Sequence, residues 1–392
     1  MSQPFAGIRV VDFTQVLAGP FATQQLAQHG AEVIKVEPPG SGDMTRNLMK
    51  GQKGSPSFVT CNIGKKSLTL DLKGPAAAPV MQRLLATADV LVQSFRPGVM
   101  TRLGLGYEAV REIKPDIVYC SISGFGQTGP ASHLPAFDGA IQAASGMMAI
   151  TGHPETGPTR TGYMPVDMAT GLNASFAISA ALYRRLASGA GQHIDVAMMD
   201  TAMVLQASQV SAYLIGGAIP ELFGNRSPTR APTANVFEAA DGYLQIVALK
   251  EPQVAALFTA LGIGERLADF DGGADRIERT AEINALLEPI LRGQTVEYWL
   301  AALETAGVPA AAIRDYPAVT ADPQFEGRPI FATTEVEAGE RVRVVGAAHT
   351  TSEDPPHAQR PAPELSEHTD EILAELGFDA TDIDGWRAAQ AI

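Results

Sequence analysis

The sequence has 392 residues, more than a single hydrophobic core usually organises, so two domains are expected. With 43 acidic against 29 basic residues and a net charge of −14, the surface is unsuited to general nucleic-acid binding. No stretch has the apolar length of a membrane span and the N-terminus lacks a secretion signal, so we expect a soluble cytoplasmic protein with no membrane partner.

The cysteines and histidines give no sign of a metal or disulfide framework. The 2 cysteines, Cys61 and Cys120, occur in apolar, strand-like contexts without paired spacing, which predicts buried, inert thiols in a reducing compartment. The 7 histidines form no motif such as H-E-x-x-H, so the sequence predicts no metal site.

The first part of the chain alternates short apolar runs with helical stretches. Strands are predicted over 8–13, 31–37, 89–95 and 116–126, and helices over 20–30, 75–86 and 106–113. Pro20 suits the first turn of a helix and Gly30 suits a helix end. Strands that alternate with helices predict an α/β fold with a doubly wound parallel sheet.

The second part begins with a helix that follows Asp167 and runs to about Ser188, and a buried strand is predicted over 191–200. Proline-, threonine- and arginine-containing loop sequence over 223–237 marks a domain boundary. We therefore predict a large Rossmann-like domain over 1–224 and a smaller α+β domain over 225–322. The last segment, 323–392, is predicted to be an extended proline-rich linker with a C-terminal helix over 366–376 that returns to the large domain.

Two familiar chemistries lack their signatures. The turn "DFTQVLAGP" follows a strand and opens a helix, but it holds only Gly19 instead of the three glycines of a dinucleotide-binding turn. The segment "SISGFG" around Ser123 is no nucleophile elbow for a serine hydrolase.

Asp167 is a lone carboxylate at the start of a helix of small and apolar residues. Its spacing alone is typical of a helix cap. Four basic residues follow predicted strand ends, where open α/β sheets bind ligands: Arg46, Lys73, Arg96 and Arg102. Each of them taken singly is as well explained as a solvated surface charge.

Six motifs in order carry a resemblance over nearly the whole chain: "GIRVVDFTQVLAGPFATQQLAQHGAEVIKVEPPGSGDMTR", "NIGKKSLTLDLK", "DVLVQSFRPGVMTRLGL", "SISGFGQTGP", "GQHIDVAMMD" and "HTDEILAELG". Together they resemble the class III CoA-transferase family, also called the formyl-CoA transferase or CaiB/BaiF family. The resemblance implies an enzyme that moves CoA from an acyl-CoA such as succinyl-CoA to a small organic acid, with no permanently bound cofactor. It also implies an interlaced, ring-like homodimer.

The resemblance implies that Asp167 is the nucleophile, which we expect to be ionised at neutral pH. Asp167 would form mixed anhydrides and an aspartyl-CoA thioester in turn, so that thioester energy is retained. Gln15 would hold an anhydride oxygen or only the turn. The positions that match the family's CoA contacts are Gln15, Val16, Ala18, Leu70, Lys73, Ser94, Phe95 and Arg102.

Four further residues keep alternatives open. The α-methylacyl-CoA racemases of the same superfamily carry a His-Asp pair where this chain has Phe137 and Asp138, which argues against racemase activity because phenylalanine cannot titrate. Glu251 argues for it, because racemases tend to have an acidic residue at that position. Asp138 could orient the acceptor acid or cap its own helix. Arg226 and Arg230 could meet the distal carboxylate of a dicarboxylate, or they could be surface or dimer-contact residues.

Overall fold

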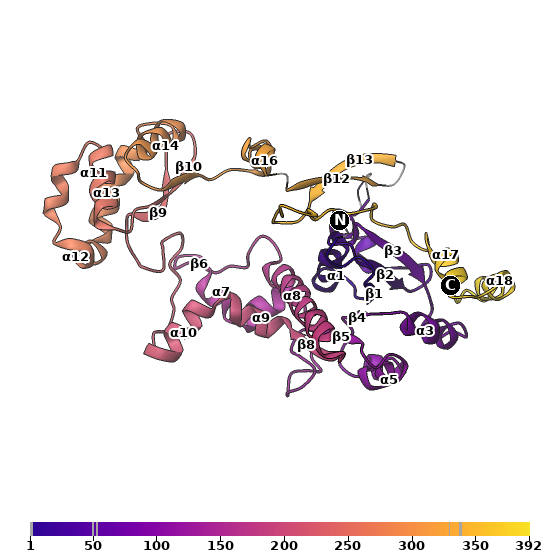
Figure 1. Cartoon of the computed structure of the whole chain (residues 1–392). Coiled ribbons are helices and arrows are strands. Elements are labelled where there is room, and N and C mark those ends of the chain that lie inside the picture. Colours follow the sequence, from indigo (N-terminus) through magenta and orange to yellow (C-terminus); the bar gives the residue numbers. More distant parts are fainter. Residues whose placement is uncertain (1–2, 49–50, 52–53, 329, 337–338) are drawn as a thin grey trace. The chain divides into compact units, whose positions relative to one another are not determined.

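The computed structural model describes residues 3–48, 51, 54–328, 330–336 and 339–392. The chain divides into two compact units. Unit 1 contains residues 1–147, 161–217 and 324–392, and unit 2 contains residues 148–160 and 218–323. Each unit is described by itself below, with the element labels of Figure 1.

Unit 1 is built on a six-stranded sheet in the order β3-β2-β1-β4-β5-β8, and every neighbouring pair runs parallel. This arrangement confirms the predicted α/β fold with a parallel sheet. The strands are β1 (Arg9–Phe13), β2 (Glu32–Glu37), β3 (Lys65–Thr69), β4 (Val90–Gln93), β5 (Val118–Ser123) and β8 (Gln192–Ala197). Because the strand order reverses between β1 and β4, a crevice is expected outside the carboxyl ends of these two strands.

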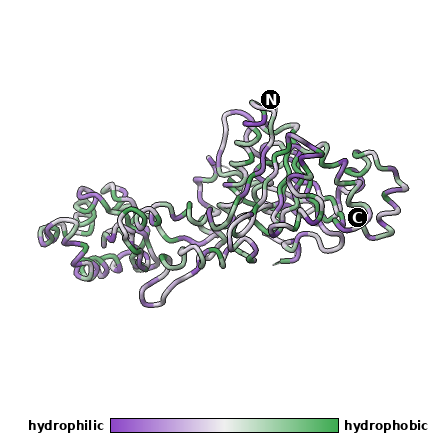
Figure 2. The backbone as a smooth tube through the Cα atoms, turned by 90° about the horizontal axis from the view of Figure 1, so that it is seen from below, coloured by the Kyte–Doolittle hydropathy of each residue, from purple (hydrophilic) through white to green (hydrophobic). Residues whose placement is uncertain are grey.

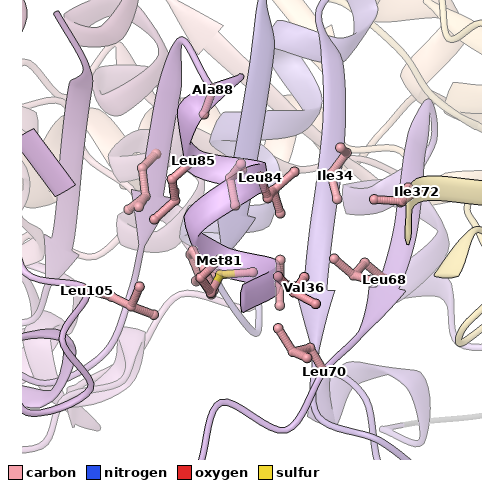
Figure 3. Packing of buried hydrophobic residues seen from close by; sticks show 14 of the residues in the cluster. Ile34, Val36, Leu68, Leu70, Met81, Leu84, Leu85, Ala88, Leu105 and Ile372 are labelled. Atoms are coloured by element: carbon pink, nitrogen blue, oxygen red, sulfur yellow. The ribbon is translucent and has the colours of Figure 1, made fainter. Parts of the chain in front are cut away.

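Helices cover both faces of this sheet. The helices of this unit include α1 (Ala18–Gln28), α2 (Pro56–Asn62), α3 (Ala77–Ala86), α4 (Val99–Arg102), α5 (Tyr107–Ile113), α6 (Asp138–Ala144), α8 (Pro165–Ser188), α9 (Met198–Leu205) and α10 (Ala207–Gly216), with a 3₁₀ turn η1 (Met44–Arg46). The short helix α7 (Met147–Ile150) begins at the end of one segment of this unit, and its residues from 148 on belong to unit 2. On one face α3 packs Met81, Leu84 and Leu85 against Ile34 and Leu68 of the sheet (Figure 3). On the other face α1 and α8 pack against the sheet and against each other.

The C-terminal segment returns to the edge of the same sheet. Helix α17 (Thr369–Glu375) lies beside β3, where the backbone N–H of Thr69 donates to Thr369 Oγ1 at 3.0 Å (Figure 1). Ile372 of α17 joins the core around Ile34 and Leu68 (Figure 3). Hydrophobic stretches of the chain are concentrated among these packed segments, whereas many connecting loops are hydrophilic (Figure 2).

Unit 2 has its own core around an antiparallel three-stranded sheet in the order β11-β10-β9. Its elements are β6 (Gly152–His153), β7 (Gly157–Pro158), β9 (Ala234–Glu238), β10 (Tyr243–Val247), α11 (Glu251–Ala260), η2 (Gly264–Asp269), α12 (Gly272–Glu278), α13 (Thr280–Leu291), α14 (Val296–Thr305), β11 (Ala310–Ala312) and α15 (Tyr316–Thr320). Helices α11, α13 and α14 supply the apolar faces that cover this sheet. The mixture of helices and an antiparallel sheet is of the α+β kind.

The structure adds elements that the sequence pattern does not reveal. The polar segment 65–69 forms strand β3, and Cys61 lies in α2 instead of a strand because Ser55 caps that helix and Pro56 occupies its first turn. The segment 324–392 contains α16 (Gln324–Gly327), an antiparallel pair β12 (Phe331–Val336) and β13 (Glu340–Val345), and a last helix α18 (Ala380–Ala388) in addition to α17. Cys61 and Cys120 are both free and buried.

Candidate active site

The crevice at the carboxyl ends of β1 and β4 holds a cavity of about 310 Å³. We call it the Asp167 cavity. It is lined by the loop after β1, the first turn of α1, the loop after β4, the start of α8 and parts of the loops around 123 and 134. Its lining residues include Gln15, Val16, Ala18, Gly19, Ser94, Phe95, Arg96, Phe137 and Asp167. The structure thus brings the predicted nucleophile together with five of the predicted CoA contacts.

A second cavity of about 530 Å³, the Arg102 cavity, is lined by residues that follow β1, β2, β3 and β4. It contains the other three predicted CoA contacts, Leu70, Lys73 and Arg102. Gln15 and Phe95 line both cavities, so these two residues stand at their junction. Two cationic side chains on one cavity suit an anionic group such as a phosphate.

Asp167 reaches its cavity because α8 lies close to the start of α1. Asp167 is in the first turn of α8, and Gly171 follows one turn later on the same helix. A Cβ atom on Gly171 would lie 2.7 Å from the carbonyl oxygen of Ala18 and 2.9 Å from Phe21, so only glycine permits this approach. The small residue therefore sets the distance between Asp167 and the first turn of α1.

Asp138 fixes the backbone of the same helix start. Its Oδ2 accepts the backbone N–H of Val166 at 2.9 Å and of Asp167 at 3.1 Å, and its Oδ1 accepts from Gln142 at 2.5 Å. Asp138 is the first residue of α6, but the helix that it caps is α8. Of the two alternatives for Asp138, capping of its own helix is therefore wrong, because its Oδ2 accepts the N–H groups at the start of α8.

The carboxylate of Asp167 accepts no hydrogen bond from any residue that the structure describes, so the helix-cap explanation does not hold for it. Its side chain is 8 % exposed. Burial, and then the negative charge of Asp138, raise the pKa of Asp167 from 3.8 to about 7. The pKa of this carboxyl group therefore lies well above the ordinary value on which the expected ionisation at neutral pH was based.

The backbone around the cavity is held by polar contacts. The N–H of Gln15 donates to Ser94 Oγ at 3.1 Å, and the N–H of Phe95 donates to Gln93 Oε1 at 2.8 Å. Gln93 in turn donates to Ser121 at 2.9 Å inside the sheet. These hydrogen bonds connect the loop after β1 to the loop after β4, and they fix the backbone at Gln15 and Phe95, where the two cavities meet.

The first turn of α1 supplies backbone donors to the Asp167 cavity. Ala18 and Gly19 belong to this turn and line the cavity. N–H groups of a first helical turn have no partner within the helix, and the helix dipole adds positive potential there. The arrangement can stabilise an oxyanion that forms beside Asp167.

Residues 5–369 match the CoA-transferase family III. The succinate–glutarate CoA-transferase of Agrobacterium fabrum is 38% identical over 95% of this chain and 96% of its own. The acetyl-CoA:oxalate CoA-transferase of Acetobacter aceti is 37% identical over 93% of both chains. The crystal structure of a CaiB/BaiF family protein from Brucella suis, 36% identical, superposes with a TM-score of 0.86 over 96% of this chain and 100% of its own.

This chain belongs to CoA-transferase family III. It is a CoA-transferase, and its substrates are CoA thioesters and organic acids. The resemblance inferred from six motifs is therefore confirmed. Among the predicted contact residues, Leu70 directly follows β3, Ser94 directly follows β4, and Gln15 and Val16 lie in the loop after β1, as the strand-end rule for ligand sites requires.

Three residues singled out by the sequence lie in unit 2 of this CoA-transferase, whereas Asp167 belongs to unit 1. Arg226 and Arg230 line a cavity of about 520 Å³, where Arg230 pairs with Glu221 at 3.7 Å. Glu251 opens α11 and pairs with the buried guanidinium of Arg276. These contacts leave the roles proposed for the three residues open to experiment.

Arg46, another basic residue after a strand end, lines neither the Asp167 cavity nor the Arg102 cavity of the CoA-transferase. Arg46 pairs with Glu37 through two nitrogens at 2.8 and 2.6 Å and stacks over Phe58, so its charge is already compensated. No group of three or more His, Cys, Asp or Glu suited to a metal ion occurs among the described residues. No helix in that part of the chain is long and apolar enough to cross a membrane.

Proposed function

We propose that this CoA-transferase uses Asp167 as a covalent nucleophile and carries CoA on it as an aspartyl thioester. The observation that carries the proposal is a buried carboxylate in a ligand-sized cavity, which has no hydrogen-bond donor of its own among the described residues and a pKa raised to about 7. A weakly solvated carboxylate of raised basicity is a better nucleophile than one in water.

In the first half-reaction, Asp167 Oδ attacks the thioester carbonyl of the donor, and collapse of the tetrahedral oxyanion expels CoA thiolate and leaves a mixed anhydride. The thiolate then attacks the aspartyl carbonyl of this anhydride, releases the donor acid and leaves aspartyl-CoA. In the second half-reaction, the acceptor carboxylate attacks aspartyl-CoA and expels the thiolate, which attacks the acceptor's carbonyl in the new anhydride and restores Asp167. No proton is transferred, and every intermediate is itself activated.

The surroundings of Asp167 support these steps. Each step passes through an oxyanion, and the N–H groups of Ala18 and Gly19, residues of the first turn of α1 that line the same cavity, would stabilise it. The Gln15 side chain, at the junction of the cavities, would hold an anhydride oxygen in addition to shaping the turn. Phe137 also lines the cavity and cannot titrate, so it offers no second base for racemisation.

A trapping experiment tests the covalent route. The enzyme is mixed with an acyl-CoA, quenched with hydroxylamine or borohydride, and digested for mass spectrometry. We expect modification of the peptide that holds Asp167, and none in D167N. D200N, which changes an exposed carboxylate in the first turn of α9, serves as the matched control and retains the modification. Full turnover with an unmodified Asp167 peptide would refute the route.

The Arg102 cavity is proposed to hold the nucleotide part of CoA. Lys73 and Arg102 would meet its phosphates, Leu70 would contact apolar parts, and Phe95 and Gln15 would guide the pantetheine chain towards Asp167. The remaining predicted contacts, Val16, Ala18 and Ser94, line the Asp167 cavity, where the thioester would lie. A crystal soaked with CoA would reveal this path directly.

The acceptor is proposed to be a short dicarboxylate and the donor succinyl-CoA or a similar thioester. The two named relatives act on succinate, glutarate and oxalate, all dicarboxylates. Arg226 and Arg230 share a cavity in unit 2, and two guanidinium groups on one cavity would bind a carboxylate. A panel of mono- and dicarboxylates with several acyl-CoA donors, read by mass spectrometry, identifies the pair. R226Q and R230Q should raise KM for dicarboxylates only, whereas R266Q, at an exposed arginine paired with Asp269, should not.

The enzyme is also proposed to be a cytoplasmic homodimer. Helix α8 exposes an apolar stripe at positions 172, 176, 183 and 186, and α10 has no buried residue in this chain although it ends in Tyr213, Leu214 and Ile215. A ten-residue helix without packing is marginal in water, so a second copy is expected to cover it. Sedimentation at micromolar concentration tests this: a mass of one chain would count against the dimer.

A further inference from the structure

The loop after β1 contains a strained residue. Val16 has φ +70°, in the left-handed region, and it is the only β-branched residue with positive φ among those the structure describes. A branched side chain makes this conformation costly, and such residues persist only where their surroundings enforce them. Val16 and its neighbour Gln15 both line the Asp167 cavity, so the strain lies at the active site.

One buried carboxylate enforces this turn. The N–H of Val16 donates to Asp43 Oδ1 at 3.3 Å, and Lys35 Nζ lies 2.9 Å from the other oxygen of Asp43. Lys35 Nζ also donates to the carbonyl oxygen of Thr14 at 2.7 Å. The ion pair therefore binds the backbone on both sides of Gln15, through the carbonyl oxygen of Thr14 and the N–H of Val16.

The ion pair itself is buried and has further hydrogen-bond partners. The side chains of Asp43 and Lys35 are fully buried. Asp43 Oδ1 also accepts the backbone N–H of Thr45 at 2.9 Å, and the N–H of Asp43 donates to Glu37 at 2.9 Å. A carboxylate with this many partners has one orientation, so it presents a fixed acceptor to Val16.

We propose that Asp43 is a positioning residue for CoA transfer, which acts through Val16 to hold the Gln15–Val16 turn in its left-handed conformation at the junction of the two cavities. Asp43 lines neither cavity. Its effect reaches the reaction because the turn places the Gln15 side chain and leads into the first turn of α1. The cationic side chains of the Arg102 cavity lie on other loops, so the phosphate contacts proposed for CoA do not depend on Asp43.

A double-mutant cycle tests the proposal, with D43N, V16G and their combination. Glycine adopts positive φ without strain, so the turn of a V16G protein no longer needs a clamp. We expect D43N to lower kcat about 10- to 100-fold and to change the Kd of CoA less than about threefold. In the V16G background, the same D43N substitution should lower kcat less than about threefold. An equal loss in both backgrounds would overturn the proposal, because it would show that Asp43 acts independently of the strain.

If D43N fails to fold, as judged by circular dichroism and thermal unfolding, the V16P variant tests the role of Asp43 instead. Proline removes the N–H that Asp43 accepts and restricts φ to negative values, while it leaves the Asp43–Lys35 pair in place. We expect V16P to lose at least as much kcat as D43N. A V16P enzyme with the parent's kcat would sink the proposal.

This inference rests on the CoA-transfer activity of the family and not on the covalent route through Asp167. The readouts are ratios of transfer rates for the fastest donor and acceptor pair. An enzyme that never acylates Asp167 would refute the proposed chemistry and leave these ratios unaltered, whereas equal D43N effects in both backgrounds would refute only the role of Asp43.

Discussion

The Oδ2 atom of Asp138 accepts the backbone N–H of Asp167 at 3.1 Å, so one carboxylate fixes the main chain of another while its charge bears on that residue's pKa. The capping contact stabilises the helix start. The charge of Asp138 adds to burial in raising the pKa of Asp167 to about 7. Asp138 therefore orders the start of the helix that holds Asp167 and, after burial, contributes to the raised pKa of Asp167.

The first prediction concerns the acid limb of the pH profile. D138N removes the negative charge beside Asp167, so the pKa of Asp167 should fall, and burial should keep it above 3.8. The pH of half-maximal kcat/KM on the acid side should move from near 7 to a lower value, measured over roughly pH 5 to 9. The D200N control should keep the parent profile. An acid limb unchanged in D138N would show that Asp138 does not tune the nucleophile.

The second prediction concerns stability. Because folding raises the pKa of Asp167 from 3.8 to about 7, its contribution to stability is fully present below pH 3.8 and is lost as the pH rises to about 7. D167N stays neutral throughout. The free energy of unfolding of D167N minus that of the parent, both measured in urea, should therefore be roughly 2–3 kcal/mol larger at about pH 8 than at about pH 5. A difference between the two proteins that is the same at both pH values would contradict the raised pKa.

The sequence predicts the sheet well where strands are apolar and fails where they are polar. Strands β1, β2, β4 and β5 contain runs of Val, Ile and Leu that fill both faces of a parallel sheet. Strand β3 reads as polar because it contains Lys65, which is fully buried through an ion pair with Asp12 at 2.9 Å and contacts with Pro20 and Asn62. A buried cation of this kind is specified by partners far away in the sequence, so no local pattern reveals it.

The candidate site also has features that the sequence predicts and features that only the folded structure reveals. The strand-end rule and the family motifs lead to Asp167, Lys73 and Arg102, whose positions follow from the order of strands and loops. The pKa of Asp167 depends on burial and on Asp138, 29 residues earlier in the chain, and neither can be read from local spacing. The role proposed for Asp43 depends on a dihedral angle at Val16. Sequence reasoning finds residue types, whereas folded geometry sets their chemistry.

The third prediction concerns the nucleotide end of CoA. R102Q removes a cation from the Arg102 cavity, and we expect the Kd of CoA, measured by calorimetry, to rise roughly 10-fold or more because a charged hydrogen bond to phosphate is lost. Pantetheine, which lacks the phosphates, should bind both proteins alike. R111Q, at an exposed arginine of α5 that pairs with Glu108, is the matched control and should bind CoA as the parent does. Equal weakening of pantetheine and CoA binding would point to a disturbed fold instead of a lost phosphate contact.

The fourth prediction concerns the close approach of α8 and α1. In G171A the new methyl group would meet the carbonyl of Ala18 at 2.7 Å, so the two helices must separate. We expect a loss of about 1–3 kcal/mol of stability from overpacking. We also expect kcat to fall by more than about 10-fold, because Asp167 moves away from the first turn of α1 and an oxyanion beside it loses its donors.

The matched substitution for this test is G385A, within helix α18, where a Cβ would meet nothing within 4 Å. Because alanine is the better helix former, G385A should keep the parent's kcat and raise its stability by up to about 1 kcal/mol. Thermal unfolding and transfer rates of the two variants separate helix propensity from helix contact. If G171A behaved like G385A in both measurements, α8 would not need Gly171 to bring Asp167 to α1, and the geometry proposed for catalysis would have to be abandoned.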